Sequence, residues 1–273
     1  MLAKELVNKY CEDGVVLLRQ VFDQRCVEKL ASATDRLMQT PSRFGNYTQT
    51  NEGGRFFNDF CNWRNIPEFQ EFVEKSVAAQ IVGELMRSTF TGFYHEQIMV
   101  KEARASIKSP WHQDQPYFPI KGNKMCSIWM PLDKVNSQTS LRVVKGSHKW
   151  GVQYKPRSFQ KNNPEYQLKS SAEEFEDIRN FESTISNYEI EAWDLEPGDI
   201  LVFHGLTLHS ANANESHHQT RRVFITRWFG DDAVFSNRPW DYTPPINGGL
   251  KPGESMECIE FPCVWDNREN LNK

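Results

Sequence analysis

The segment Trp111–Asp114 contains residue types that bind metal ions. His112 and Asp114 stand two positions apart, so on an extended strand their side chains point to the same side. A second histidine would complete a set of two histidines and one carboxylate. Such a set holds non-heme Fe(II) and leaves coordination positions open for a co-substrate and O2. Pro110 and Pro116 flank the triplet, which favours a short extended segment. We therefore expect His112 and Asp114 to be metal ligands.

Several histidines compete for the place of the third ligand. Both His204 and His209 follow the turn-forming stretch 196–199 and the apolar strand predicted at 200–203. His204 ends that strand and would equally suit a hydrogen-bonded core position. His209 begins a polar bend, where a ligand can face an open cavity, and this favours His209 modestly. The other candidates are His95, His148, His217 and His218.

Two adjacent arginines follow His209 on the next predicted strand. Arg221 and Arg222 must point to opposite faces of that strand, because side chains alternate. A guanidinium that enters the protein interior is costly unless it is paired, and a carboxylate bound through two hydrogen bonds removes that cost. The pair therefore predicts a clamp for a dicarboxylate co-substrate. Arg227 is a further candidate, and a surface position for both members of the pair is the alternative.

The elements that must position these residues are mainly short strands. Apolar and β-branched segments separated by Gly, Pro, Asn and Asp predict strands at 91–100, 125–132, 200–204 and 223–229. The N-terminal part predicts a helix over 2–11, a strand over 14–22, a helix over 24–39 capped by Asp23, a loop over 40–54 and a helix over about 66–87. This order indicates a mainly β fold, an antiparallel barrel or jelly roll with flanking helices.

We expect residues 1–273 to form a single domain. It would comprise a mainly helical N-terminal buttress (1–90), a jelly-roll core (91–235) with a lid-like insertion at about 150–190, and a C-terminal extension (236–273). The long segments 40–55 and 150–188 are expected to cover the site, because long insertions in compact domains often do so.

Composition excludes several classes of partner. The net charge of −4 indicates neither nucleic acid nor an anionic membrane as a ligand. No apolar run approaches the roughly 18 residues that a membrane span requires. The six cysteines form no CxxC pair, and the N-terminal residues lack a signal-peptide pattern, so we expect a cytoplasmic protein. Residues 134–164 hold seven Lys or Arg and no acid, which suggests attraction of an anionic substrate group, although a solvated basic loop is the simpler interpretation.

The ordered motifs resemble the phytanoyl-CoA dioxygenase-like family of Fe(II)/2-oxoglutarate-dependent oxygenases. The matching segments, in the order of the family, are WHQD (111–114), IWMPL (128–132), RVVKGSH (142–148), GD (198–199), HSANANES (209–216) and RRVFITRWFGDD (221–232). Residues 13–16 resemble the family's N-terminal strand. Each motif is weak alone, but their order and rough spacing match across residues 91–235.

The resemblance implies a double-stranded β-helix (jelly-roll, cupin-like) core in which His112, Asp114 and His209 bind iron. It favours Arg221 as the clamp for 2-oxoglutarate. The gap from His209 to the arginine pair is one residue longer than is usual in the family, so Arg222 stays an alternative.

The resemblance also places two further residues near the co-substrate and implies a reaction. Gln97 and Lys101 match family positions beside 2-oxoglutarate. The implied reaction hydroxylates an unactivated C–H bond of a small-molecule substrate, with O2 consumed and succinate and CO2 released. A carboxylate at Asp114 favours hydroxylation, desaturation or ring formation over halogenation, because related halogenases have a small residue there. The alternatives are a metal-dependent hydrolase that uses the same His/Asp/His set and a non-catalytic ligand-binding barrel.

Overall fold

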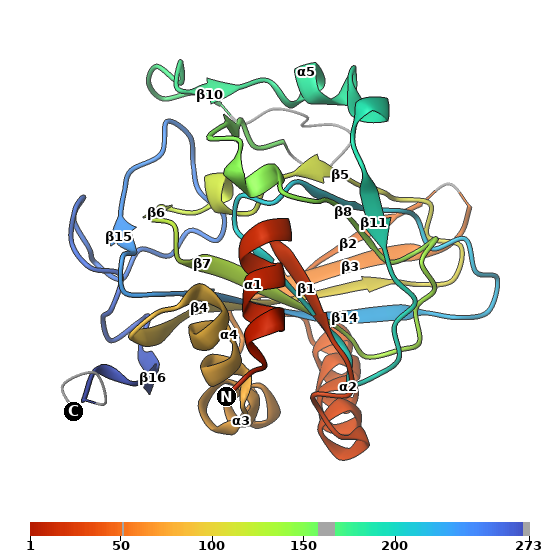
Figure 1. Cartoon of the computed structure of the whole chain (residues 1–273). Helices are drawn as coiled ribbons and strands as arrows, with labels where there is room; N and C mark the ends of the chain where they lie inside the picture. Colours follow the sequence, from red (N-terminus) through yellow and green to blue (C-terminus); the bar gives the residue numbers. More distant parts are fainter. Residues whose placement is uncertain (51, 158–166, 270–273) are drawn as a thin grey trace.

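The computed structural model describes residues 1–50, 52–157 and 167–269 (Figure 1). The helices are α1 (Lys4–Asp13), α2 (Gln24–Gln39), α3 (Pro67–Lys75), α4 (Ala78–Met86) and α5 (Ile178–Glu182). The strands up to residue 131 are β1 (Val15–Leu18), β2 (Asn46–Gln49), β3 (Arg55–Phe60), β4 (Phe90–Lys101), β5 (Ser109–His112), β6 (Ile120–Lys121) and β7 (Met125–Pro131). The later strands are β8 (Leu141–Val144), β9 (Gln153–Tyr154), β10 (Phe175–Glu176), β11 (Ile190–Ala192), β12 (Ile200–His204), β13 (His209–Ala211), β14 (Arg221–Phe229), β15 (Val234–Phe235) and β16 (Cys263–Asp266).

Two antiparallel sheets form the core. The larger sheet has the order β1-β12-β7-β14-β4-β3-β2, with β16 paired to one end of β4, and the smaller sheet has the order β11-β8-β13-β5. Helices α2, α3 and α4 lie against one side of the larger sheet, and the smaller sheet lies on its other side (Figure 1). The expected mainly β fold with a double-stranded β-helix core is confirmed.

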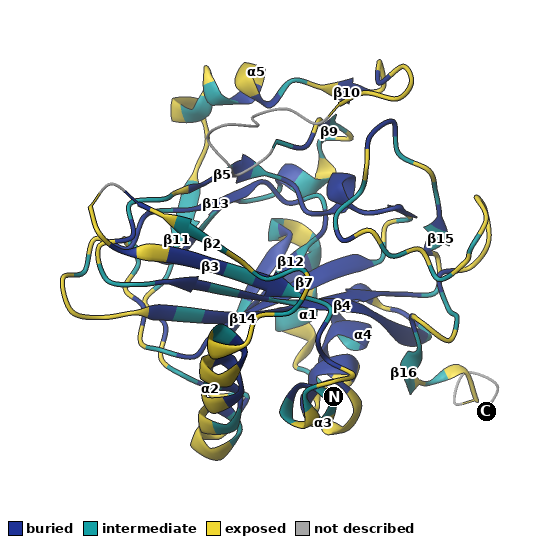
Figure 2. Cartoon of the chain, turned by 180° about the vertical axis from the view of Figure 1, so that it is seen from behind, coloured by how far each residue is buried: buried dark blue, intermediate teal, exposed yellow. Residues whose placement is uncertain are grey.

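The alternation of side chains along β4, β7 and β14 gives the larger sheet an apolar face and a second face where apolar and charged side chains are mixed. On the helix-facing side, Ile98, Met130 and Trp228 belong to the main hydrophobic core together with residues of all four N-terminal helices. The exposed residues of those helices lie on their outer sides (Figure 2). The opposite side of the same strands carries Lys101 and Arg221 and faces the smaller sheet. The helix-facing side therefore forms the main core, whereas the other side combines apolar packing with the charged residues of a site.

The register of the two sheets brings distant motifs together. In the larger sheet β14 lies between β4 and β7. Arg221 of β14 is opposite Lys101 of β4, and Arg227 of β14 is opposite Ser127 of β7. In the smaller sheet the residue opposite His112 is His209. Residues that are roughly 100 positions apart in the chain thus become neighbours.

Two N-terminal elements differ from the expectation. The single helix expected over 66–87 is divided into α3 and α4, because Ser76 has an extended backbone and its hydroxyl accepts a hydrogen bond from the Ala78 N–H at 3.2 Å. The segment expected to be a loop contains β2, which pairs with β3 along its whole length. The start of α2 is as expected, since Asp23 accepts a hydrogen bond from Cys26 N at 2.8 Å.

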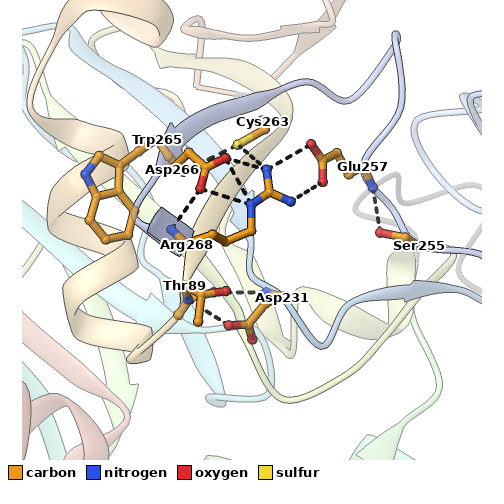
Figure 3. A network of polar contacts seen from close by, with 9 residues as sticks. Thr89, Asp231, Ser255, Glu257, Cys263, Trp265, Asp266 and Arg268 are labelled. Carbon is orange, nitrogen blue, oxygen red and sulfur yellow. Dashed lines mark hydrogen bonds and ion pairs between the residues drawn. The ribbon is translucent and has the colours of Figure 1, made fainter. Parts of the chain in front are cut away.

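The segment after β8 covers the end of the smaller sheet. In the residues that are described there, β9 pairs with β10, and α5 packs near β5 through Trp111 and Phe181, whose ring centroids are 5.6 Å apart. At the C-terminal end, Arg268 binds Asp266 and Glu257 (Figure 3). Its guanidinium also lies over the ring of Phe90 at 4.7 Å, beside the end of β4 that pairs with β16. Within the described ranges we find no helix with the length and apolarity to cross a bilayer.

Candidate metal and co-substrate site

His112, Asp114 and His209 meet between the two sheets. His112 ends β5, Asp114 follows it by two residues, and His209 begins β13, the strand paired with β5. Asp114 Oδ1 lies 3.6 Å from His112 Nε2 and 3.6 Å from His209 Nε2. One ligand atom from each residue lies within 4.8 Å of the others. The structure therefore brings together the three residues that the sequence indicated as metal ligands.

Backbone carbonyls orient both histidine rings. His112 Nδ1 lies 2.8 Å from the carbonyl oxygen of Pro110, and His209 Nδ1 lies 2.9 Å from that of Thr207. A ring whose Nδ1–H donates to a carbonyl carries its lone pair on Nε2, the atom that faces Asp114. Both rings thus present the nitrogen that a metal requires.

The protonation states also suit a metal. Burial lowers the pKa of His112 to about 4, helped by the nearby His209, so the ring is neutral at pH 7. Burial alone would raise the pKa of Asp114. The charge of Arg227 and the contacts with the two histidines outweigh burial and hold that pKa well below its usual range. A neutral imidazole and a carboxylate are forms that bind divalent metals.

The same cavity continues from the triad to a second polar region. The cavity has an empty volume of about 540 Å³ including its mouth. Its apolar walls include Trp129, Phe203 and Val223. The polar residues that line it are Gln97, Lys101, Ser109, His112, Asp114, His209, Ser210, Arg221 and Arg227. Three of these are Lys or Arg and one is acidic, so the cavity suits an anionic ligand.

Lys101 and Arg221 form the cationic end of the cavity. Both are almost fully buried. Lys101 Nζ donates to the carbonyl oxygen of Asn212 at 3.0 Å, and Arg221 donates to the carbonyl oxygen of Thr139. Within the described chain neither has a carboxylate partner, and Arg221 Nε has no hydrogen-bond acceptor. Burial lowers the pKa of Arg221 to about 10, and burial together with Arg221 lowers that of Lys101. Two buried basic side chains without an acidic partner fit one carboxylate of a bound ligand.

Arg222, the alternative clamp, does not reach this cavity. It points to the other face of β14, where its guanidinium lies 2.7 Å from Asp133 and 2.8 Å from Asp35. These hydrogen bonds raise its pKa. Its charge is already balanced, so the structure offers Arg221 and not Arg222 to a co-substrate.

The other candidates from the sequence have clear positions. Gln97 lines the cavity, and its side-chain amide donates to Asn58 Oδ1 at 2.5 Å. His204 lies outside the triad, with Nε2 2.6 Å from the carbonyl oxygen of Asn123, and accepts a hydrogen bond on Nδ1 from Leu206 N. His148 contacts the carbonyl oxygen of Cys11. These contacts account for both histidines as hydrogen-bonded structural residues.

Three of the six described basic residues in the stretch 134–164 have acidic partners, among them Lys134, which lies beside Glu196. Arg157 binds Glu182 with its guanidinium, and Lys145 lies 3.8 Å from Asp13. Lys161 lies outside the described residues. The cavity itself is lined by the buried basic side chains of Lys101, Arg221 and Arg227, none of which belongs to this stretch.

Two residues, Ser127 and Arg227, contact the carboxylate of Asp114, and the motifs did not indicate these contacts. Ser127 Oγ donates to Asp114 Oδ2 at 2.5 Å, and Arg227 Nε lies 3.3 Å from the same oxygen. A signal for Arg227 was present in the sequence, because it stands six residues after Arg221 on one strand and so shares its face. Ser127 had no comparable signal.

Comparison with known proteins identifies the class. The model of the phytanoyl-CoA dioxygenase (PhyH) family matches residues 10–223. A probable phytanoyl-CoA dioxygenase of Caenorhabditis elegans is 21% identical over 221 residues, which are 78% of this chain and 67% of the relative. The fold and the buried His/Asp/His centre are those of a non-heme Fe(II)- and 2-oxoglutarate-dependent dioxygenase. The chain belongs to the phytanoyl-CoA dioxygenase family, as its motifs predicted.

Solved structures share the fold. The non-heme α-ketoglutarate-dependent epimerase SnoN from nogalamycin biosynthesis has a TM-score of 0.74 at 18% identity, covering 96% of this chain and 98% of that chain. The corresponding carbocyclase, SnoK, has a TM-score of 0.74 at 22% identity and covers 96% of each chain. EctD from S. alaskensis, solved with 2-oxoglutarate and 5-hydroxyectoine, has a TM-score of 0.71 at 14% identity, covering 95% and 86%.

Proposed function

We propose that this protein hydroxylates an unactivated C–H bond of a small-molecule substrate, with conversion of 2-oxoglutarate into succinate and CO2. The observation that carries the proposal is that one cavity holds both a buried His112/Asp114/His209 centre and the buried pair Lys101 and Arg221. A hydrolytic zinc site would need only the first of these features. The second feature supports a co-substrate that carries a carboxylate at each end.

His112, Asp114 and His209 would hold the iron. Their donor set of two imidazole nitrogens and one carboxylate is the one that suits non-heme Fe(II) and leaves one side of the metal open. Bound there, Fe(II) supplies O2 activation coupled to the oxidation of 2-oxoglutarate. The contribution of the chain is to fix both rings through the carbonyls of Pro110 and Thr207.

Arg221 would bind the distal carboxylate of 2-oxoglutarate. Its planar donors match a carboxylate through two parallel hydrogen bonds, and arginine stays charged even where burial lowers its pKa to about 10. Lys101, opposite it in the sheet, would add a second donor. Gln97, on the same face of β4, would form a polar wall of the same cavity. In this proposal the cost of burying two cations is offset when the co-substrate binds.

The substrate would be a small molecule. The related folds support this, since SnoN was solved with nogalamycin RO and EctD with 5-hydroxyectoine. Their printed activities include epimerisation and carbocycle formation, so one fold serves several outcomes. Asp114 is present as a third ligand and leaves no place for a halide, which disfavours halogenation; among the outcomes that remain, we propose hydroxylation for this chain.

Anaerobic absorption spectroscopy tests the site. Fe(II) and 2-oxoglutarate added together should give a weak visible charge-transfer band with the native protein. We expect the band to disappear in His112→Ala and in Asp114→Ala. His148→Ala is the matched control, because it removes a histidine that contacts Cys11 and not the centre. A band that survives in either ligand variant would contradict the ligand assignment.

Turnover tests the reaction class. Succinate release should depend on O2 and 2-oxoglutarate and should rise with a true substrate in a panel of small molecules, with one oxygen atom added to the product. A substrate consumed without O2 and 2-oxoglutarate would indicate a hydrolase instead. A band without stimulation by any substrate would favour a ligand-binding barrel.

A further inference from the structure

The two carboxylate oxygens of Asp114 have different surroundings. Oδ1 faces the metal-binding side, 3.6 Å from Nε2 of His112 and 3.6 Å from Nε2 of His209. Oδ2 faces away, with Ser127 Oγ at 2.5 Å and Arg227 Nε at 3.3 Å. The carboxylate is thus oriented before any metal binds.

The sheet register creates this difference. Ser127 of β7 and Arg227 of β14 are directly paired residues of neighbouring strands. Both are buried, at 0% and 6% exposure, so their contacts with Oδ2 are largely shielded from bulk water. Within the described chain, Arg227 Nε and Nη1 have no hydrogen-bond acceptor, and Asp114 is the carboxylate in ion-pair contact with this guanidinium. Arg227 therefore depends on Asp114 Oδ2 for charge compensation.

We propose that Ser127 and Arg227 are positioning residues that restrict Asp114 to one-oxygen binding of the metal and so keep a coordination position open beside the bound co-substrate. This inference rests on the proposed function. It assigns a role to two residues that touch neither the metal nor 2-oxoglutarate in the proposal.

The consequence of losing this restraint follows from coordination chemistry. A carboxylate binds a cation through one oxygen or through both. If Oδ2 turned to the metal, the Ser127 hydroxyl would lose its acceptor and the Arg227 guanidinium would lose its buried counter-charge. Asp114 would then occupy a second position on an octahedral metal. With 2-oxoglutarate chelating through two atoms, no position would remain for a small gas molecule.

Nitric oxide, a stable surrogate for O2, tests this directly. The Fe(II) protein is titrated with nitric oxide under anaerobic conditions, with and without 2-oxoglutarate, and the adduct is followed by electron paramagnetic resonance. The variants are Ser127→Ala, Arg227→Met and the two combined. Ser140→Ala is the control, because it also removes a buried hydroxyl but one with no hydrogen-bond partner. Arg227→Lys tests rescue by a residue that keeps the charge.

We expect the combined variant to keep the charge-transfer band and to bind nitric oxide about 10- to 100-fold more weakly when 2-oxoglutarate is present, the size of effect seen for outer-shell partners of metal ligands. Without 2-oxoglutarate its affinity for nitric oxide should match that of the native protein. Arg227→Lys should recover part of the loss, and Ser140→Ala should show none.

Two results would overturn the proposal. One is unchanged nitric oxide binding in the combined variant with 2-oxoglutarate present. The other is loss of the charge-transfer band in all three of these variants and in Arg227→Lys, which would show that the residues maintain the site as a whole and do not direct one oxygen. Failure of the proposed function is recognised separately, because the native protein itself would then give no band with Fe(II) and 2-oxoglutarate.

Discussion

The two faces of β14 treat buried charge in opposite ways. On the cavity face, Arg221 is almost fully buried and has no carboxylate partner within the described chain. On the other face, its neighbour Arg222 is bound by two aspartates, Asp133 and Asp35. The guanidinium of Arg222, which faces away from the cavity, is therefore paired with carboxylates of the protein. The guanidinium of Arg221, which faces the cavity, has no such partner within the described chain.

The same division applies to apolar packing. The helix-facing side of β14 places Phe224 and Trp228 in the main core, against helix residues such as Phe69 and Phe72. The cavity side is lined by Val223, Ile225 and the two arginines of the site, with space between the sheets. An uncompensated buried cation lowers stability, whereas a well-packed aromatic residue raises it. The helix-facing side thus belongs wholly to the main core, whereas the cavity side combines apolar packing with buried charges that lower stability.

The largest loss of stability is expected when an aromatic residue is removed from the helix-facing side of β14. Phe224 contacts the rings of Phe69 and Phe72 at centroid distances of 4.9 and 5.1 Å. Phe224→Ala should lower the free energy of unfolding by about 3–5 kcal/mol, because a large cavity replaces the ring. Urea denaturation measures this loss. At low temperature, where the variant stays folded, its affinity for 2-oxoglutarate should stay close to the native value; a matching loss of affinity would show that the faces are not independent.

Replacing each of the two neighbouring arginines in turn tests whether the two faces of β14 have different roles. Arg221→Met should weaken 2-oxoglutarate binding by about 2–5 kcal/mol, which is roughly 30-fold or more, because a buried charge partner is lost. The same substitution should raise the stability of the ligand-free protein, since it removes an uncompensated buried cation. Arg222→Met should leave binding unchanged and lower stability by about 1 kcal/mol. Calorimetric titration with Mn(II) and 2-oxoglutarate, together with denaturation, measures both quantities. Equal loss of binding in both variants would contradict the division.

Much of this division follows from periodicity that is visible in the sequence. His112 and Asp114 stand two residues apart, and Arg221 and Arg222 must separate to opposite faces, so a metal-binding side and a clamp were predictable. Which arginine enters was not, because the answer depends on Asp133 and Asp35, which meet Arg222 only in the folded sheet. The motif order of the family favoured Arg221 and left Arg222 as an alternative.

Other features depend on contacts that no local pattern encodes. Ser127 reaches Asp114 only because the register of β7 and β14 places it opposite Arg227. The end of α3 at Ser76 was hidden because apolar residues continue at helical spacing through the break, while the backbone turns to an extended conformation at that one serine. Pairing across strands and single backbone turns are set by the whole fold, and these were the parts that sequence periodicity did not predict.

A third effect, visible only as a dependence on pH, concerns a carboxyl group on the packed side of the sheet. Glu96 of β4 is fully buried and accepts hydrogen bonds from the N–H groups of Asn62 and Trp63, at 2.5 and 3.2 Å. Burial raises its pKa from 4.5 to about 8, although those two N–H groups act in the opposite direction. The folded protein therefore binds this proton more tightly than the unfolded chain does. The resulting stability is fully present below pH 4.5 and is lost as the pH rises towards about 8.

Glu96→Gln should remove this dependence on pH. We expect the free energy of unfolding of the native protein, relative to that of the variant, to fall by about 1.4 kcal/mol per pH unit across this window. Denaturation curves collected at several pH values give the difference directly. If the free energies of unfolding of the two proteins instead changed equally with pH, the carboxyl group would already be ionised in the folded protein, held in that form by the two N–H groups. The affinity for 2-oxoglutarate should be the same in both proteins at each pH, because Glu96 lies on the face of β4 opposite Gln97 and Lys101 and is not among the residues that line the cavity.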